Sequence, residues 1–334
     1  MTIKEIAQQL NLSSGTVSKA LNNAADISEE TKKLVCEYAK KVGYRATKAL
    51  GNRIALLYQF MQTNYQNQLF FSVSTAFSIA ASNSEYEIVT DILANKDEKF
   101  DLNEYMDNNH FAGAFVLGVN FDSPVYLQLQ NAKYPLVLLD MYIPFNPSIA
   151  SIGSESMASI QQAIHYLKEM GHIKIGFLSG EQQSFVASER LAAYILSISS
   201  IGIKFNTDYI YYGDFTRECG AEAAKHFAST DVTAILCASD MMAIGLIDGL
   251  NRQGIRIPDD ISVIGFDDLE LLRYTQYDLT TLRQDFVKLG EAAFFQLHNL
   301  IKGKSSKRIS IPCELIKRGT VRKLNETKSA PPRE

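Results

Sequence analysis

The sequence lacks the features that mark exported or membrane-spanning proteins. Its longest apolar runs, such as 54–57 and 114–119, fall far short of the roughly 18 to 20 residues that a membrane span needs. The N-terminal segment MTIKEIAQQL is polar and amphipathic, and it has neither the basic start nor the apolar stretch of a signal peptide. We therefore expect a cytoplasmic protein without a membrane partner.

Cysteine and histidine are few, and their spacing favours neither a disulfide framework nor a metal site. The four cysteines, at positions 36, 219, 237 and 313, form no CxxC pair and have no histidine beside them, and the five histidines are scattered. Reduced and mostly buried thiols are expected. The sequence implies no metal and no cofactor.

Motifs of common α/β enzymes are missing as well. No GxGxxG follows a first strand, and no nucleophile elbow of the form GxSxG is present. The segment GKSS at 303–306 has His298 where a phosphate-binding loop requires glycine. An enzyme that uses strand-end carboxylates as catalysts is therefore disfavoured.

The length, composition and charge that are present indicate several globular units with one basic end. The chain has 334 residues, 46% hydrophobic and 21% charged, which predicts two or three compact domains. Residues 1–50 carry eight Lys and Arg against five acids, a net charge of +3, whereas the rest of the chain carries −7. This distribution concentrates attraction for phosphates at the N-terminal end.

The first 46 residues predict a small three-helix head. Apolar residues recur at helical spacing from Ile3 to Leu10, and a second apolar stripe from Val17 to Leu21 follows Ser13, a favourable N-cap. The short turn between the two stripes has helix-turn-helix spacing. A third helix is expected to start after Ser28, with these residues on its inner face or at its end: Leu34, Tyr38, Val42 and Gly43.

From residue 54 onward, β-rich apolar runs alternate with helical patterns. Near-continuous apolar strands separated by helices indicate parallel sheets covered on both faces, so the predicted body is doubly wound α/β. Periodicity alone leaves open whether there is one sheet or two. The eight predicted strands are IALLYQF (54–60), YEIVTDIL (86–93), GAFVLGV (113–119), LVLLDMY (136–142), KIGFLSG (174–180), YIYYGD (209–214), AILCASD (234–240) and SVIGFDD (262–268).

The head segments TIKEIA, TVSKALNN and ISEET resemble the lactose/galactose repressor family of bacterial regulators. Body segments such as YLKEMGHIKIGFLSG and SVIGFDD match the effector-binding part of that family, which is similar to periplasmic sugar-binding proteins. The resemblance covers essentially residues 2–322 and is weakest between 95 and 150. It implies a homodimeric repressor that binds double-stranded operator DNA and is controlled by a small molecule held between two lobes.

The resemblance also implies where the head touches DNA, with the second helix in the major groove. The candidates for reading bases are Ser14, Gly15 and Lys19. Gly15 has no side chain to read with, and Lys19 replaces the frequent Arg, so the operator sequence stays open. The candidates for phosphate contacts are Ser13, Thr16, Ser18 and Asn22.

The linker between head and body, 47–53, is short for this family. Only nine residues, RATKALGNR, separate Tyr44 from Ile54, and relatives usually place a longer segment with a hinge helix there. Leu50 is the candidate for a minor-groove wedge, with simple packing against the body as an equal alternative.

The family motifs place the effector between two lobes of the body, which spans 54–324 and precedes a polar tail, 325–334. Asp267 and Arg190 are the first candidates for effector contacts, because a carboxylate and a guanidinium together can share sugar hydroxyls. Asp240 is expected to cap the following helix. Phe70 and Phe215 are the expected aromatic walls, and the secondary polar contacts are Asp140, Ser184, Ser239 and Gln284.

The expected lobe one comprises 54–147 and 281–306, and lobe two 148–280 and 307–324. Gly153, Ser154 and Ser184 depart from the family pattern in a way that disfavours a nucleobase, so a sugar or sugar derivative is the expected ligand. A regulator controlled mainly by a protein partner, such as a phosphocarrier protein, is the alternative.

Overall fold

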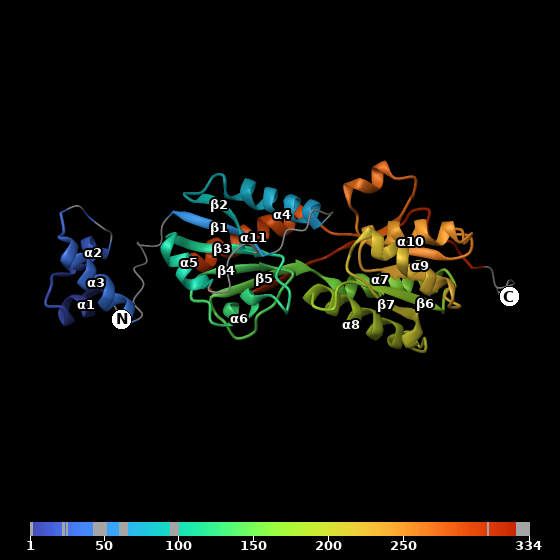
Figure 1. Cartoon of the computed structure of the whole chain (residues 1–334), viewed down its shortest axis with the longest axis horizontal. Helices are drawn as coiled ribbons and strands as arrows, with labels where there is room; N and C mark the ends of the chain where they lie inside the picture. The colour runs from blue at the N-terminus through green and yellow to red at the C-terminus, as the bar shows by residue number, and fades with distance from the viewer. Residues whose placement is uncertain are drawn as a thin grey trace.

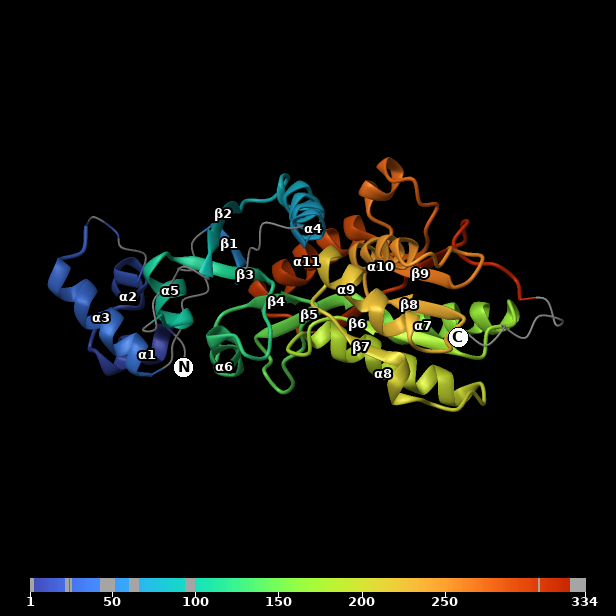
Figure 2. The same cartoon turned by 45° about the vertical axis from the view of Figure 1, so that its right-hand side comes forward.

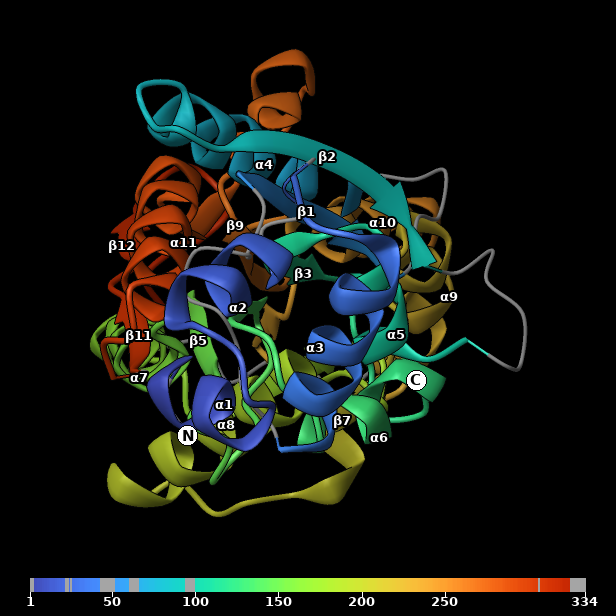
Figure 3. The same cartoon turned by 90° about the vertical axis from the view of Figure 1, so that its left-hand side faces the viewer.

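The computed structural model describes residues 3–21, 24, 26–42, 52–59, 66–93, 100–305 and 307–324. Its parts follow one another along the long axis: a three-helix head, lobe one, and lobe two at the far end (Figure 1). Viewed from the head end, the three short helices lie in front of lobe one (Figure 3). Within the described residues, no helix is long and apolar enough to cross a membrane.

The head consists of α1 (Ile3–Gln9), α2 (Ser14–Leu21) and α3 (Glu29–Lys41). Asn11 adopts a left-handed conformation (φ 57°) in the turn after α1. Ser13 accepts the backbone N–H of Thr16 at 3.0 Å, and Ser28 accepts that of Thr31 at 3.2 Å, so both predicted caps are confirmed. Gly43, the predicted end of the third helix, lies outside the described residues.

The inner face of α3 differs from the prediction at one position. Leu34 is 50% exposed, and Val35 and Ala39 are the buried residues instead. Tyr38 and Val42 lie at the edge of the same small core, as partly buried neighbours. The prediction was wrong at Leu34 because the buried stripe of α3 is rotated by one residue along the helix.

Lobe one is built on a fully parallel six-stranded sheet with the order β11-β5-β4-β3-β1-β2. Its strands are β1 (Arg53–Tyr58), β2 (Glu87–Ile92), β3 (Phe111–Leu117), β4 (Leu136–Leu139), β5 (Ile149–Ser154) and β11 (Arg308–Ile311). Its helices are α4 (Gln66–Ala81), α5 (Leu102–Asn108), α6 (Pro124–Gln130) and α11 (Phe286–Ile301).

Helices α4 and α11 lie side by side on lobe one although they are far apart in the sequence (Figures 1 and 2). Gly290 makes this approach possible, because a Cβ atom there would lie only 2.3 Å from the backbone oxygen of Val73. Helix α11, which comes late in the sequence, thus completes lobe one.

Lobe two is built on a second six-stranded sheet with the order β12-β10-β9-β8-β6-β7, in which β12 alone runs antiparallel. Its strands are β6 (Ile175–Ser179), β7 (Ile210–Tyr212), β8 (Ala234–Cys237), β9 (Ser262–Asp267), β10 (Thr280–Arg283) and β12 (Glu314–Ile316). Its helices are α7 (Ser156–Glu169), α8 (Phe185–Ser200), α9 (Arg217–Ala228) and α10 (Asp240–Arg252).

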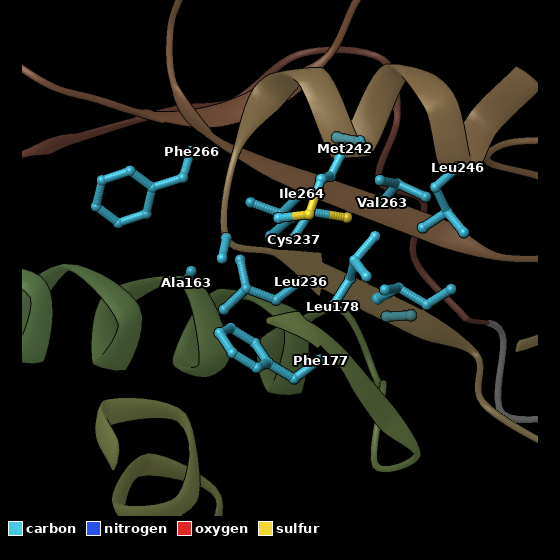
Figure 4. Close-up of a cluster of buried hydrophobic side chains, with 14 of the residues drawn as sticks. Ala163, Phe177, Leu178, Leu236, Cys237, Met242, Leu246, Val263, Ile264 and Phe266 are labelled. Carbon is cyan, nitrogen blue, oxygen red and sulfur yellow. The ribbon is translucent and has the colours of Figure 1, made fainter. Parts of the chain in front are cut away.

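The core of lobe two shows why its strands are apolar along their whole length. Figure 4 places Leu178 and Val263 on the side of the sheet covered by α10, with Met242 and Leu246 above them. On the other side, Phe177 stacks on the ring of Tyr194 from α8 at 4.8 Å. Both faces are covered by helices, so the predicted doubly wound α/β body is confirmed.

The chain crosses between the lobes three times: after β5, after β10 and after β11. The predicted lobe borders therefore move by several residues, because β5 and β11 belong to the sheet of lobe one and β10 to that of lobe two. The expectation of mostly buried thiols also needs correction, since only Cys237 is buried and Cys36 is exposed.

Candidate functional site

A cavity of about 150 Å³ lies between the lobes, where the carboxyl ends of their parallel strands face each other. This is the edge at which open α/β sheets place their ligand groups. Seven of the eight predicted effector contacts line it: Phe70, Asp140, Ser184, Arg190, Phe215, Ser239 and Asp267.

The Arg190 side chain, from α8, is held at the back of the cavity. It is 3% exposed, and its Nη1 donates to the backbone oxygen of Ala238 at 2.5 Å. Its guanidinium lies 3.6 Å from the ring centroid of Phe266, and its Nη1 is 4.0 Å from Oδ1 of Asp267. These contacts hold the guanidinium in one place.

Asp267 ends β9 and is 5% exposed. Its Oδ1 accepts Nε2 of Gln284 at 2.5 Å, and Oε1 of Gln284 accepts the hydroxyl of Ser154 at 2.5 Å. Gln284 therefore lies behind Asp267 and does not line the cavity, contrary to the prediction that it contacts the effector. Because Ser154 ends β5 of lobe one, Gln284 links the two lobes.

Asp140 reaches the cavity from lobe one, after the end of β4. Burial raises the pKa of its carboxyl to about 6, against the opposing effect of the Arg190 charge. Burial likewise raises the pKa of Asp267 to about 6, again opposed by Arg190. Gly153 leaves room for Asp140, since a Cβ atom there would lie 2.8 Å from Oδ1.

Three of the lining residues have backbone conformations that side chains rarely adopt. Asp140, Phe215 and Asp267 have φ values of 51°, 68° and 120°. The ring of Phe215 occupies the space where a Cβ atom on Gly180 would be, 2.1 Å from its Cζ. Backbone strain of this kind concentrates at ligand sites, where precise placement of a side chain outweighs its cost.

The hydroxyls at the cavity also start helices. Ser184 caps α8 by accepting the N–H of Ala187, and Ser239 caps α10 by accepting that of Met242. Asp240 is therefore not the cap that the sequence predicted. It is fully buried and accepts the N–H of Leu269 and the hydroxyl of Thr281, and burial raises its pKa well above the usual value.

In the head, the predicted DNA contacts that the structure describes lie at the start of α2 and along it. Ser13, Ser14, Gly15 and Lys19 are exposed, Thr16 and Ser18 are half-buried, and Val17 and Ala20 are buried against the other helices. Ser13 is engaged as the cap and also bonds the hydroxyl of Thr16 at 2.9 Å. Asn22 and Leu50, the remaining candidates, lie outside the described residues.

Comparisons with known proteins fit this pairing of a helical head with a two-lobed body. Residues 2–46 match the model of the bacterial regulatory proteins of the lacI family, and residues 164–321 match that of a periplasmic binding protein-like domain. The HTH-type transcriptional repressor CytR of Escherichia coli (strain K12) is 29% identical over 336 residues, 97% of each chain. The chain thus combines a DNA-binding domain of the lacI family with a periplasmic-binding-protein-like domain.

Other lacI-family repressors and structures align over almost the whole chain. The HTH-type transcriptional repressor PurR of Mannheimia succiniciproducens is 28% identical over 340 residues, which cover 97% of this chain and 99% of the relative. Two solved structures share the fold. One is a complex of the transcriptional regulator CelR with cellobiose, at 24% sequence identity and a TM-score of 0.73, and the other is the lac repressor dimer bound to operator and the anti-inducer ONPF, at 20% identity and a TM-score of 0.70. Each alignment covers 96% of this chain and 99% of the other chain. By its two domains and its relatives, the protein is a DNA-binding transcriptional regulator and not an enzyme.

The cavity has further polar lining residues that the sequence analysis missed: Asn120, Glu181, Asp214 and Thr216. Asn120 follows β3, Glu181 follows β6 and Asp214 follows β7, so the strand-end rule applied to every strand would have found them. Nδ2 of Asn120 donates to Oε2 of Glu181 at 2.9 Å, which connects the lobes across the cavity mouth.

A second contact between the lobes involves Arg308 of β11. Its guanidinium pairs with Glu189 of α8 and lies 5.3 Å from the ring of Tyr142 in lobe one and 5.6 Å from that of Phe185 in lobe two. The lobes are therefore joined on the surface as well as through the Gln284 link.

We predict that Arg308→Gln weakens lobe closure slightly. Because the pair is partly exposed, its loss costs about 0.2 to 1 kcal/mol, so the affinity for a ligand in the cleft should fall by no more than about fivefold. Isothermal titration of the variant and the parent checks this. A loss above about 50-fold would mean that Arg308 belongs to the ligand site itself.

Proposed function

We propose that this lacI-family protein is a homodimeric repressor, acting in the cytoplasm, whose affinity for operator DNA is set by an uncharged sugar or sugar derivative bound between the lobes. The observation that carries the proposal is the buried Arg190 and Asp267 pair, which faces Asp140 of the other lobe across the cavity. A guanidinium only donates hydrogen bonds and an ionised carboxylate only accepts them, so together they suit hydroxyls, which do both.

The size and walls of the cavity support a single sugar ring. A cavity of about 150 Å³ is large enough for one six-membered ring. Phe70 and Phe215 supply apolar faces against which the C–H side of a pyranose packs. Because the ligand would touch both lobes, it would favour one arrangement of them and so act on the spacing of two heads in a dimer.

The charge of the lining supports an uncharged ligand over a phosphate or a uronate. The carboxylates Asp140, Glu181, Asp214 and Asp267 stand against the single guanidinium of Arg190. The N-termini of α8, α9 and α10 add roughly half a positive charge each, which leaves the lining negative. A bound anion would be repelled by this lining.

The test is isothermal titration of the full chain against neutral hexoses and pentoses, the corresponding 6-phosphates and uronates. We expect saturable binding of a neutral sugar, and the same sugar should change the affinity for an operator selected from random duplexes. Tighter binding of an anionic form would contradict the charge argument. Absence of binding across the panel would instead favour control by a protein partner.

For the head, we propose that Ser14, Gly15 and Lys19 face base edges and that Ser13, Thr16 and Ser18 face phosphates. The exposure of Ser13, Ser14, Gly15 and Lys19, beside the buried Val17 and Ala20, supports this assignment. Asn22 and Leu50 stay in the proposal on the family resemblance alone.

We further predict that the homodimer covers the outer face of α4. Phe71 and Ile79 are 72% and 67% exposed on this helix and lie on one side of it, an arrangement that favours a protein contact. Phe71→Asp should convert a dimer into a monomer in sedimentation at micromolar concentration and lower operator affinity. Leu196→Asp, at a residue 57% exposed on α8, serves as the matched control and should leave the dimer intact. A dimer that survives Phe71→Asp would place the interface elsewhere.

A further inference from the structure

Lys19 at the end of α2 is engaged in an ion pair within the head. Its Nζ lies 2.5 Å from Oδ2 of Asp26, which follows in the segment before α3, and both side chains are 57% exposed. The hydrogen bond from Lys19 holds the pKa of Asp26 below its usual range, so the carboxylate is ionised at neutral pH. Lys19 is also the single Lys or Arg within α2.

This pairing changes what Lys19 contributes to DNA binding. A free ammonium on the outer face of α2 would bind any nearby phosphate, regardless of sequence. An ammonium paired with Asp26 has beside it a carboxylate that repels phosphate, so a close phosphate contact would require the pair to separate. Non-specific binding therefore gains little from Lys19.

A base contact is affected differently. The Lys19 ammonium has three donors, so it can keep Asp26 on one and donate another to an acceptor on a base edge. Its flexible four-carbon stem has no fixed geometry of its own, and the anchor at Asp26 supplies one. The same carboxylate thus positions Lys19 for one base while opposing its use as a general phosphate contact.

We propose that Asp26 is a specificity-determining residue of the head, which positions Lys19 for base readout and withholds it from non-specific phosphate binding. The proposal rests on the proposed placement of α2 in the major groove. It predicts that the pair sets the ratio of operator to non-specific affinity more than either affinity alone.

The test uses the full chain with Asp26→Asn, a random-sequence duplex and an operator selected with the parent. Binding is measured by fluorescence anisotropy between 50 and 200 mM KCl. Release of Lys19 should raise the affinity for the random duplex about threefold to tenfold and steepen the slope of log K against log salt by about 0.9, the value for one added phosphate contact. Operator affinity should rise less, so the specificity ratio falls.

Two further variants separate positioning from net charge. Glu29→Gln removes another exposed carboxylate of the head, one that pairs with Lys32 at 2.7 Å, and should shift both affinities in parallel. In a Lys19→Ala background, Asp26→Asn should leave the salt slope unchanged. Asp26→Ser repeats the test if the Asn variant unfolds at lower temperature than the parent.

These measurements decide whether Asp26 acts on DNA binding through Lys19. A fall in the specificity ratio that depends on Lys19 supports the proposal. An equal shift on both duplexes, as for Glu29→Gln, or an effect that persists without Lys19, would overturn it. A parent that selects no operator from the random duplexes would instead contradict the placement of α2 on which the proposal rests.

Discussion

Asp267→Asn is expected to shift the response to a sugar in the cleft to about 10- to 100-fold higher sugar concentration, while operator affinity stays within about twofold of the parent. The substitution keeps the shape of the side chain, and Asn tolerates positive φ better than most residues. It removes the charge that faces Arg190 at 4.0 Å and replaces one carboxylate oxygen by an amide nitrogen, which only donates hydrogen bonds. Because a hydrogen bond to a charged group is worth about 1.5 to 3 kcal/mol, affinity for the sugar should fall about 10- to 100-fold.

The matched control is Asp259→Asn in the same lobe. Asp259 is 56% exposed and pairs with Arg256 on the surface at 3.6 Å, so its loss should change neither sugar nor operator binding. Titration of the sugar that binds the parent, together with anisotropy on the selected operator, provides both readouts. Unchanged sugar affinity in Asp267→Asn, with a native thermal transition, would remove Asp267 from the site.

The sequence predicted the strands that carry long apolar runs and missed those that do not. All eight predicted strands form, whereas β5, β10, β11 and β12 went unpredicted. These four have three to six residues and include Ser, Thr, Arg or Glu. In β10, Thr280 and Thr281 are fully buried because hydrogen bonds with Thr320 and Asp240 satisfy their polar groups. Such partners lie about 40 residues away, beyond the reach of local periodicity.

The missed strands explain the shifted lobe borders. The strands β5 and β10 precede two of the crossings between the lobes, and β11 precedes the third. When a strand is not recognised in the sequence, its residues can be assigned to a lobe only by their position along the chain. The borders drawn from the family pattern consequently fell a few residues from the crossings.

Which residues line the cavity could largely be predicted because strand ends are visible in the sequence, but the depth of each side chain could not. Asp140 and Asp267 each follow an apolar run of a predicted strand, 136–139 and 262–266, so their place at a strand end is visible in the sequence. Gln284 was also predicted to contact the effector. It instead lies behind Asp267, directly after the end of β10, and donates a hydrogen bond to the Asp267 carboxylate. Whether a polar side chain faces the cavity or supports a neighbour that does is decided by tertiary packing, which one sequence does not display.

A buried carboxylate that serves a ligand often lowers the stability of the folded protein, and for Asp140 we expect this loss of stability to depend on pH. Burial raises the pKa of Asp140 to about 6, above the ordinary value of 3.8, so the folded state binds a proton more tightly than the unfolded one. The native state therefore loses stability as pH rises from about 4 to about 6. Above that range the ionised, buried carboxylate is a net cost.

Asp140→Asn should consequently raise the free energy of unfolding at pH 8 by about 1 to 3 kcal/mol, while the gain shrinks toward zero near pH 4. The same variant should weaken sugar binding, since the ligand loses a charged acceptor in lobe one. Urea unfolding at pH 4, 6 and 8, beside sugar titration at pH 8, measures both effects. Asp122→Asn, at an exposed loop position of the same lobe, is the control and should change neither quantity. A variant that is more stable yet binds the sugar as well as the parent would show that Asp140 is not a ligand residue, and a variant that is less stable at pH 8 would contradict the raised pKa.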